Sequence, residues 1–91
     1  AERATALGHL AVASGVRSVA VGEAAIASGS GAIAIGNQSS AAFTNSVAIG
    51  NGATANRANQ IKLAVLPGNW VYQYDVQNHE LVVVEGPKND R

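Results

Sequence analysis

Ser18-Val-Ala-Val-Gly22 is the stretch that decides the fold, because close variants of it return along the chain at a fixed interval. The other copies are Ala4-Thr-Ala-Leu-Gly8, Ala32-Ile-Ala-Ile-Gly36 and Ser46-Val-Ala-Ile-Gly50. The closing glycines lie fourteen residues apart without a slip. A fifth copy, Gln60-Ile-Lys-Leu-Ala64, keeps the apolar pair and loses the glycine. These periods establish an internal repeat.

Each repeat predicts two short strands and two turns. The pentads alternate apolar and small residues, which is the period of a strand, and the closing glycine suits a turn with positive φ or a close backbone approach. A second segment of small residues follows each pentad and contributes two further columns, Ala11, Ala25, Ser39 and Ala53 beside Ala13, Ala27, Ala41 and Ala55. We therefore expect residues 1–64 to form an all-β parallel β-roll, a β-solenoid of 14-residue coils stacked about 4.8 Å apart.

The columns also predict how the interior is filled. We expect Val19 and Val21, with their equivalents in the other coils, to point inward from the first strand against the Ala and Ser columns of the second. On this assignment the outward residues of the first strand are Ala20, Ala34 and Ala48. Val47→Asp is then expected to destroy its coil, and Asn51→Asp to be tolerated.

The outward residues predict self-association. The outward Ala columns, together with Leu10, Val12 and Ile26, would leave apolar patches on a thin monomer. Aromatic residues make up only 4% of the 91 residues, so a conventional core is excluded and stability has to come from repetition or from partner chains. We expect a homo-oligomer, whose number of chains these arguments leave open.

Residues 65–91 form a second segment, which predicts a β-hairpin. Trp70, Tyr72 and Tyr74 share one face of an alternating strand, and an apolar run over 81–84 supplies its partner. We expect the three aromatic side chains to cap or contact the open end of the roll, whose edge groups need protection. A ligand platform is the alternative.

Composition excludes several classes of function. The chain has no Cys and a net charge of zero, so it predicts no disulfide, no thiolate metal site and no nucleic-acid partner. No apolar run is long enough to span a membrane. His9 and His79 are far apart and lack neighbouring carboxylates at ligand spacing, and Glu80 and Glu85 lie on opposite strand faces. We expect no enzyme activity, no metal and no cofactor.

The pentads and their period resemble the head repeats of trimeric autotransporter adhesins, the YadA-like family, over residues 3–64. The resemblance implies a left-handed parallel β-roll, a homotrimer, exposure at the bacterial cell surface on an outer-membrane parent protein, and a role in virulence. It also implies attachment to a host matrix protein such as collagen, or to a host cell receptor. A motif associated with collagen binding in that family matches Asn45, Ser46, Val47, Ala48, Ile49 and Gly50. Asn56-Arg-Ala-Asn-Gln60 is similar to the segment that leads such heads into their neck.

Other interpretations stay open. Ala53 stands where the motif often has Ser, and residues 45–50 are equally consistent with scaffold. Residues 65–91 lack the heptads of an adhesin stalk, and similar repeats occur in bacteriophage tail fibres, so a virion fibre segment is the alternative function and a spacer without a ligand is a third. Phe43 and Arg57 replace the glycines of earlier coils, as contacts between protomers or with a ligand.

Overall fold

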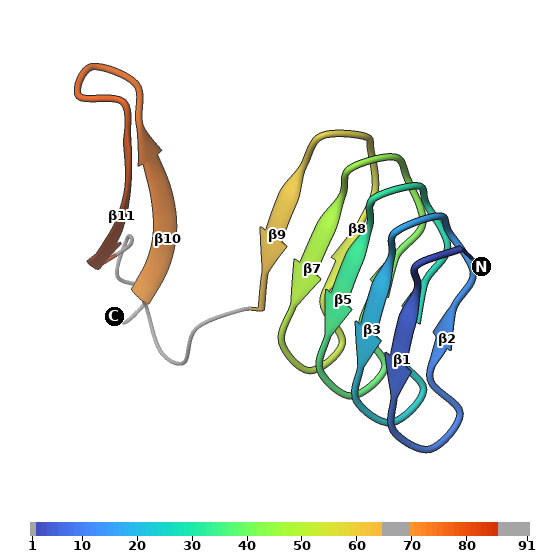
Figure 1. The fold of residues 1–91 in the computed structure, drawn as a ribbon. Coiled ribbons are helices and arrows are strands. Elements are labelled where there is room, and N and C mark those ends of the chain that lie inside the picture. Colours follow the sequence, from blue (N-terminus) through green and yellow to red (C-terminus); the bar gives the residue numbers. More distant parts are fainter. Residues whose placement is uncertain (1, 65–69, 86–91) are drawn as a thin grey trace.

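The computed structural model describes residues 2–64 and 70–85, in which every regular element is a strand (Figure 1). One parallel sheet contains β1 (Thr5–Leu7), β3 (Val19–Val21), β5 (Ile33–Ile35), β7 (Val47–Ile49) and β9 (Ile61–Leu63). A second parallel sheet contains β2 (Val12–Ala13), β4 (Ile26–Ala27), β6 (Ser40–Ala41) and β8 (Thr54–Ala55). The chain alternates between the two sheets, so the predicted parallel β-roll is confirmed.

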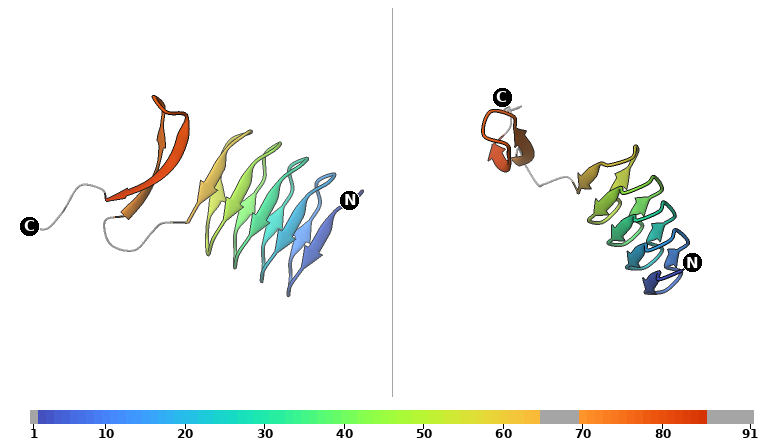
Figure 2. Two further views of the ribbon diagram at one scale, coloured as in Figure 1. Left: turned by 60° about the vertical axis from the view of Figure 1, so that its left-hand side comes forward. Right: turned by 45° about the horizontal axis from the view of Figure 1, so that its top comes forward.

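The register of both sheets follows the sequence repeat. Val19 pairs with Ile33 in the first sheet and Ile26 pairs with Ser40 in the second, and every other pair in the roll has the same offset of fourteen residues. Successive coils therefore stack on one another in sequence order, from β1 to β9 (Figure 2).

Two tight turns close each coil. In one, the Gly8 carbonyl accepts a hydrogen bond from the Ala11 N–H at 3.2 Å, and in the other the Gly15 carbonyl accepts one from the Ser18 N–H at 3.1 Å. The third residue of each turn has positive φ, 65° at Leu10 and 59° at Arg17, as in a type II turn.

The glycine that closes each pentad is needed for two reasons. Gly22 has φ of 128°, a conformation that residues with a side chain rarely adopt. A Cβ placed on Gly22 would also lie 2.7 Å from the carbonyl carbon of Gly36 in the next coil. Both predicted roles of this glycine, in a turn and at a close approach, are confirmed.

The interior of the roll corrects the predicted orientation of the first strand. Ala20, Ala34 and Ala48 have no exposed surface, so they point inward and not outward. Val19, Val21 and their equivalents point outward and not inward. The reason is the short distance between the two sheets, which the tight turns impose. The second strand also presents only Ala and Ser inward, so the space between the sheets has no room for a branched side chain.

Three buried hydroxyls complete this core. Ser18, Ser39 and Ser46 are the largest side chains without exposed surface. The Oγ of Ser46 donates to the Phe43 carbonyl at 2.7 Å, and the other two donate to carbonyls in the same way, at 2.6 and 2.8 Å. Each hydroxyl is therefore satisfied within its own turn, which removes the cost of burying it.

Strands β10 (Trp70–Asp75) and β11 (Glu80–Glu85) pair antiparallel in a separate sheet that follows β9 in the chain. Tyr74 lies opposite Leu81 in this pair. At the turn between the strands, the carboxylate of Asp75 accepts hydrogen bonds from the backbone N–H and the side-chain amide of Asn78 at 3.1 and 2.9 Å.

Candidate binding surface

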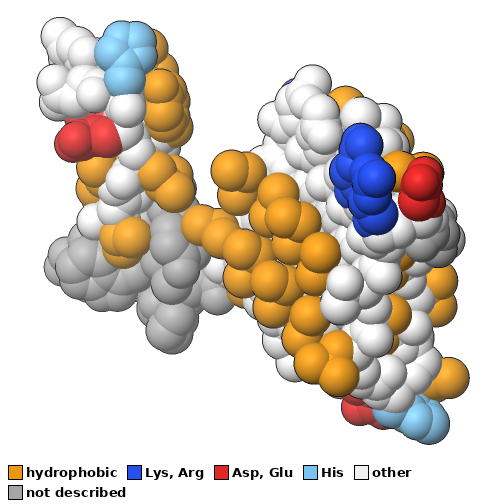
Figure 3. Space-filling model, viewed as in Figure 1, with side chains coloured by type: hydrophobic (Ala, Val, Ile, Leu, Met, Phe, Trp, Pro, Cys, Tyr) orange, Lys and Arg blue, Asp and Glu red, His pale blue; other side chains and the backbone are white. Residues whose placement is uncertain are grey.

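The outward side chains of the first sheet form a continuous apolar surface. We name the apolar face as the outward residues of β1, β3, β5, β7 and β9, which are Thr5, Leu7, Val19, Val21, Ile33, Ile35, Val47, Ile49, Ile61 and Leu63. Figure 3 shows hydrophobic side chains gathered in a band over this sheet. Nine of these ten residues are Val, Ile or Leu, and none is charged.

The exposure of the apolar face is large for residues of this kind. Ile35 and Ile49 are 38% and 39% exposed in the middle of the sheet. Fully burying one such side chain is worth about 1.5–3 kcal/mol, whereas the Ala residues of the core have little area to contribute. The large aliphatic side chains of the first sheet therefore keep part of their surface uncovered in a single chain. The sequence prediction missed this surface because it assigned the same residues to the core.

The second sheet presents a different outer surface. Its outward residues change along the roll from Val12 and Ile26 in the first coils to Ser40 and Thr54 in the later ones. The predicted outward orientation of Val12, Ile26 and Leu10 is confirmed, with exposed fractions of 46%, 41% and 67%. The second sheet therefore lacks an apolar column that runs the full length of the roll.

The motif at residues 45–50 is divided between the surface and the interior. Ser46 and Ala48 are fully buried, so their side chains cannot contact a ligand. Val47 and Ile49 belong to the apolar face, and Gly50 closes the pentad with φ of 120°. Asn45 is the one polar side chain of the motif that is exposed.

Asn45 occupies a turn that is built for it. Its φ is 55°, in the left-handed region that Asn tolerates better than most residues. Its backbone N–H donates to the Ser30 carbonyl at 2.8 Å, and its side-chain amide donates to Oδ1 of Asn59 in the next coil at 3.3 Å. Two amide side chains therefore lie one above the other at this corner of the roll.

The two residues that interrupt the glycine column lie at the surface. Phe43 is 44% exposed, and Arg57 is exposed as well. Gly29, one coil before Phe43, is buried, and a Cβ placed on it would collide with the Phe43 backbone carbonyl. A side chain at this corner is thus accommodated only in the later coils. Whether Phe43 and Arg57 contact a partner protomer or a ligand stays a prediction.

The aromatic cluster expected in the second segment is described only in part. The side chains of Trp70 and Tyr72 lie outside the described residues. Tyr74 is 55% exposed, and so are its neighbours on that strand pair, Leu81 and Val83, at 56% and 52%. The capping role of these residues stays a prediction.

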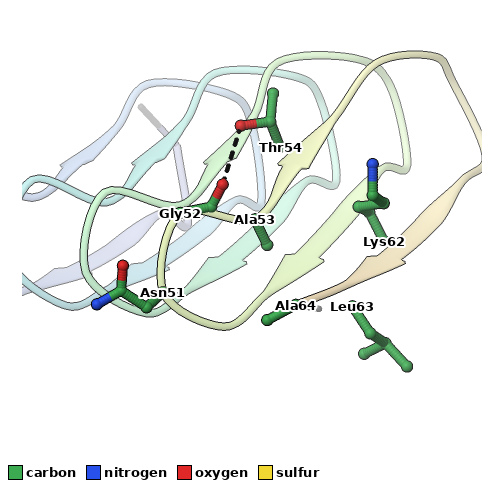
Figure 4. A pocket seen from close by; sticks show the side chains of 7 residues that line it. All are labelled: Asn51, Gly52, Ala53, Thr54, Lys62, Leu63 and Ala64. Carbon is green, nitrogen blue, oxygen red and sulfur yellow. Dashed lines mark hydrogen bonds between the residues drawn. The ribbon is translucent and has the colours of Figure 1, made fainter. Parts of the chain in front are cut away.

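The described residues hold no arrangement typical of metal or membrane sites. Within residues 2–64 and 70–85, no three His, Asp or Glu side chains lie close enough to hold a metal ion. The same residues include no helix with the length and hydropathy needed to cross a membrane. A shallow hollow of about 190 Å³ lies beside Lys62 at the β9 end of the roll (Figure 4).

Comparison with known families supports the repeat. A family model described as YadA head domain repeat (2 copies) matches residues 1–23, 27–53 and 44–59, more than half of the chain. The matched residues lie in the first four coils, leave out residues 24–26 and end before β9. The resemblance stated from the pentads is confirmed. No curated protein matches the chain closely enough to count as a relative.

Proposed function

Because the chain belongs to the family of YadA head domain repeats, we propose that it is a head module of a trimeric adhesin displayed at the bacterial surface. Three copies pack through their apolar faces around a common axis. Heads of this family are typically trimeric and surface-exposed. In this proposal the protein acts by binding and not by catalysis, and it needs no cofactor or metal.

The observation that carries the proposal is the apolar face itself. It runs the length of the first sheet, through all five strands, while the interior holds only Ala and Ser. Closed rings of identical chains bury such a surface in every copy at once. The second sheet, with Ser40 and Thr54 outward in its later coils, then faces solvent.

The packing proposal limits which residues of the motif can meet a host ligand. Val47 and Ile49 lie on the apolar face and are covered in the trimer. Asn45, with Asn59 above it, remains at the corner of the roll. We therefore place the contact with a host matrix protein such as collagen, or with a host cell receptor, at this amide pair. Three copies of a weak site on one rigid rod give useful avidity.

The assembly is tested by placing one carboxylate on each sheet. Val47→Asp puts a charge on the apolar face and is expected to lower the number of chains per particle, measured by light scattering coupled to size-exclusion chromatography. Thr54→Asp puts the same charge on the exposed side of the second sheet and is the matched control, for which the mass stays that of the wild type. Equal masses for the two variants and the wild type would count against packing through the apolar face.

The ligand site is tested with immobilised triple-helical collagen. Asn45→Ala with Asn59→Ala is expected to lower the binding of the intact assembly, while Asn51→Ala, on the other turn of the coil, is not. Binding that is unchanged by the first pair of substitutions rules out the amide pair as the contact.

A virion fibre segment is the second candidate. The antiparallel pair β10–β11 follows the roll, and residues 65–91 lack the heptads of an adhesin stalk. A roll followed by a small β element suits the structural or receptor-binding part of a bacteriophage tail fibre, located in the virion. The parent sequence separates the two: a C-terminal membrane anchor supports the adhesin, and a tail-assembly context supports the fibre.

A further inference from the structure

The second coil carries opposite charges at the two ends of one outward row. Val19 and Val21 of β3 point outward, and the same alternation continues by one step into the turn on either side. The row therefore reads Arg17, Val19, Val21 and Glu23, and both of the charged residues are exposed. A cation precedes the pentad 18–22 and an anion follows it, with the apolar face between them.

The equivalent residues of the other coils form the two long edges of the apolar face. The leading edge comes before the pentads and consists of Arg3, Arg17, Gly31, Asn45 and Asn59. The trailing edge comes after the first four pentads and consists of His9, Glu23, Asn37 and Asn51. Figure 3 shows basic side chains with an acid beside them at the upper right of the hydrophobic band, and a histidine with an acid at its lower right.

Neither charge of the second coil has a charged partner in its own chain. The backbone N–H of Arg17 donates to the Glu2 carbonyl at 2.9 Å, but its guanidinium makes no hydrogen bond or ion pair among the described residues. The Glu23 carboxylate accepts one hydrogen bond, from the side-chain amide of Asn37 at 3.2 Å. Six steps of nearly extended chain, on the order of 20 Å, keep the two charges apart within one copy.

A ring of identical chains brings the two edges together. In a ring whose axis runs along the rolls, a rotation alone relates each chain to the next, so equal coils lie at equal height. With the apolar faces turned toward the axis, the leading edge of each chain lies beside the trailing edge of the next. Arg17 of one copy then faces Glu23 of the next copy. The second coil has described coils on both sides, so this contact involves neither end of the roll.

We propose that Arg17 of each copy forms an ion pair with Glu23 of the next copy, and that this pair sets the alignment of the chains. The inference rests on the proposed packing through the apolar face. That face is similar in every coil, so it does not by itself fix the height or direction of neighbouring chains. Charge complementarity supplies such a register. A shift by one coil would set Arg17 against His9 or Asn37, and a reversed chain would bring like edges together.

The ion pair is confined to the second coil. In the third and fourth coils the two edges carry Gly31 with Asn37 and Asn45 with Asn51, which are uncharged and shorter than Arg and Glu. The amides proposed to meet a ligand therefore take no part in this contact.

The position of the contact is tested by cross-linking. The chain has no Cys, so Arg17→Cys with Glu23→Cys introduces only the two thiols that are needed and leaves the apolar face intact. A bismaleimide about as long as an Arg–Glu pair is too short to join these thiols within one chain. We expect denaturing electrophoresis to show covalent products of two and three chains and none larger. Each single Cys variant is a matched control and is expected to remain one chain.

The charge of the contact is tested by reversal. Arg17→Glu sets two carboxylates against each other in every contact, and is expected to raise the concentration at which the particle dissociates by about tenfold or more. Adding Glu23→Arg restores opposite charges and should return that concentration to near the wild-type value. Arg57→Glu changes the net charge equally at an exposed turn residue outside both edges, and is expected to have little effect.

The outcomes separate this inference from the proposed trimer. A wild-type mass of one chain in light scattering would contradict the trimer, and the ion pair with it. A wild-type particle of three chains whose double Cys variant gives no linked chains would overturn the ion pair alone. So would single Cys controls that link as readily as the double variant, or a double charge reversal that dissociates as readily as Arg17→Glu.

Discussion

Ala34 and Ala48 lie directly opposite each other in the neighbouring strands β5 and β7, and neither has any exposed surface. The residues on either side of Ala34, Ile33 and Ile35, point the other way and are partly exposed. The roll therefore keeps its small residues inside and presents its large residues outside. This inversion of the usual arrangement follows from the narrow gap between the two sheets. Substitutions on the two sides of β5 should therefore have different effects on stability.

Enlarging an inward residue should be costly. Ala34→Leu adds three carbons to a gap that holds only Ala and Ser, and overpacking of this kind costs about 1–3 kcal/mol or more of unfolding free energy. We expect a lower midpoint in urea unfolding followed by circular dichroism. Ile35→Leu, on the outer side of the same strand, is the matched control, with an expected cost below about 1.5 kcal/mol. A midpoint for Ala34→Leu equal to that of the control would contradict the Ala core.

Two glycines should differ in their tolerance of a side chain. Gly36 has φ of 126°, and an added Cβ would lie 2.5 Å from the Gly50 carbonyl oxygen, so Gly36→Ala is expected to destabilise the roll severely or prevent its folding. Gly52 has φ of 74° and no atom within 4 Å of the added Cβ. Gly52→Ala should therefore lower the unfolding free energy by only about 1–2 kcal/mol, the cost of a residue with a Cβ in the left-handed conformation. Thermal unfolding of both variants checks the order, and similar losses would exclude close stacking as the reason for the glycine column.

The buried hydroxyl of Ser46 should contribute to stability. Ser46→Ala removes the hydrogen bond to the Phe43 carbonyl, but that carbonyl still accepts from the backbone N–H of residue 46 at 3.1 Å. The Phe43 N–H, however, donates to the Ser46 Oγ at 3.3 Å and loses this acceptor, so the expected loss is about 1–3 kcal/mol. Ser46→Val keeps no hydroxyl and adds volume to the same site, so its loss should be larger. The account fails if chemical denaturation ranks the valine variant above the alanine variant in stability.

The sequence was sufficient to predict the repeat, the parallel register and the turns. The fourteen-residue spacing of the pentads determines which residues pair across coils, as Val19 with Ile33 and Ile26 with Ser40. The positive φ of Gly22 follows from its place after a strand. These features depend on local chemistry and on a period, and both are visible in a single chain.

The sequence did not reveal which side of the first strand faces inward. Alternation has a period of two, so Val19-Ala20-Val21 is consistent with either orientation. The width of the coil decides which side of the strand faces inward, and this width depends on both strands and both turns together. The absence of any large residue in the inward columns of the second strand was the available signal. The correction also moves Val47 from the interior to the apolar face, so Val47→Asp tests assembly and not the coil.

The candidate site was predicted as a motif, and the structure resolves it into separate roles. Ser46 and Ala48 support the core, whereas Asn45 is presented at a corner. Burial of alternate residues cannot be read from a six-residue match alone. The pairing of Asn45 with Asn59 depends on the stacking of two coils, which the repeat period already implied.

The central claim is that the apolar face is covered by two further copies of the chain. The most direct measurement is the molar mass of the wild-type protein in solution, by light scattering coupled to size-exclusion chromatography. The account predicts three times the 9.2 kDa of one chain. A folded particle of one chain, with cooperative thermal unfolding, would contradict it. The roll would then be stable as a monomer, with the large aliphatic side chains of its first sheet exposed to water.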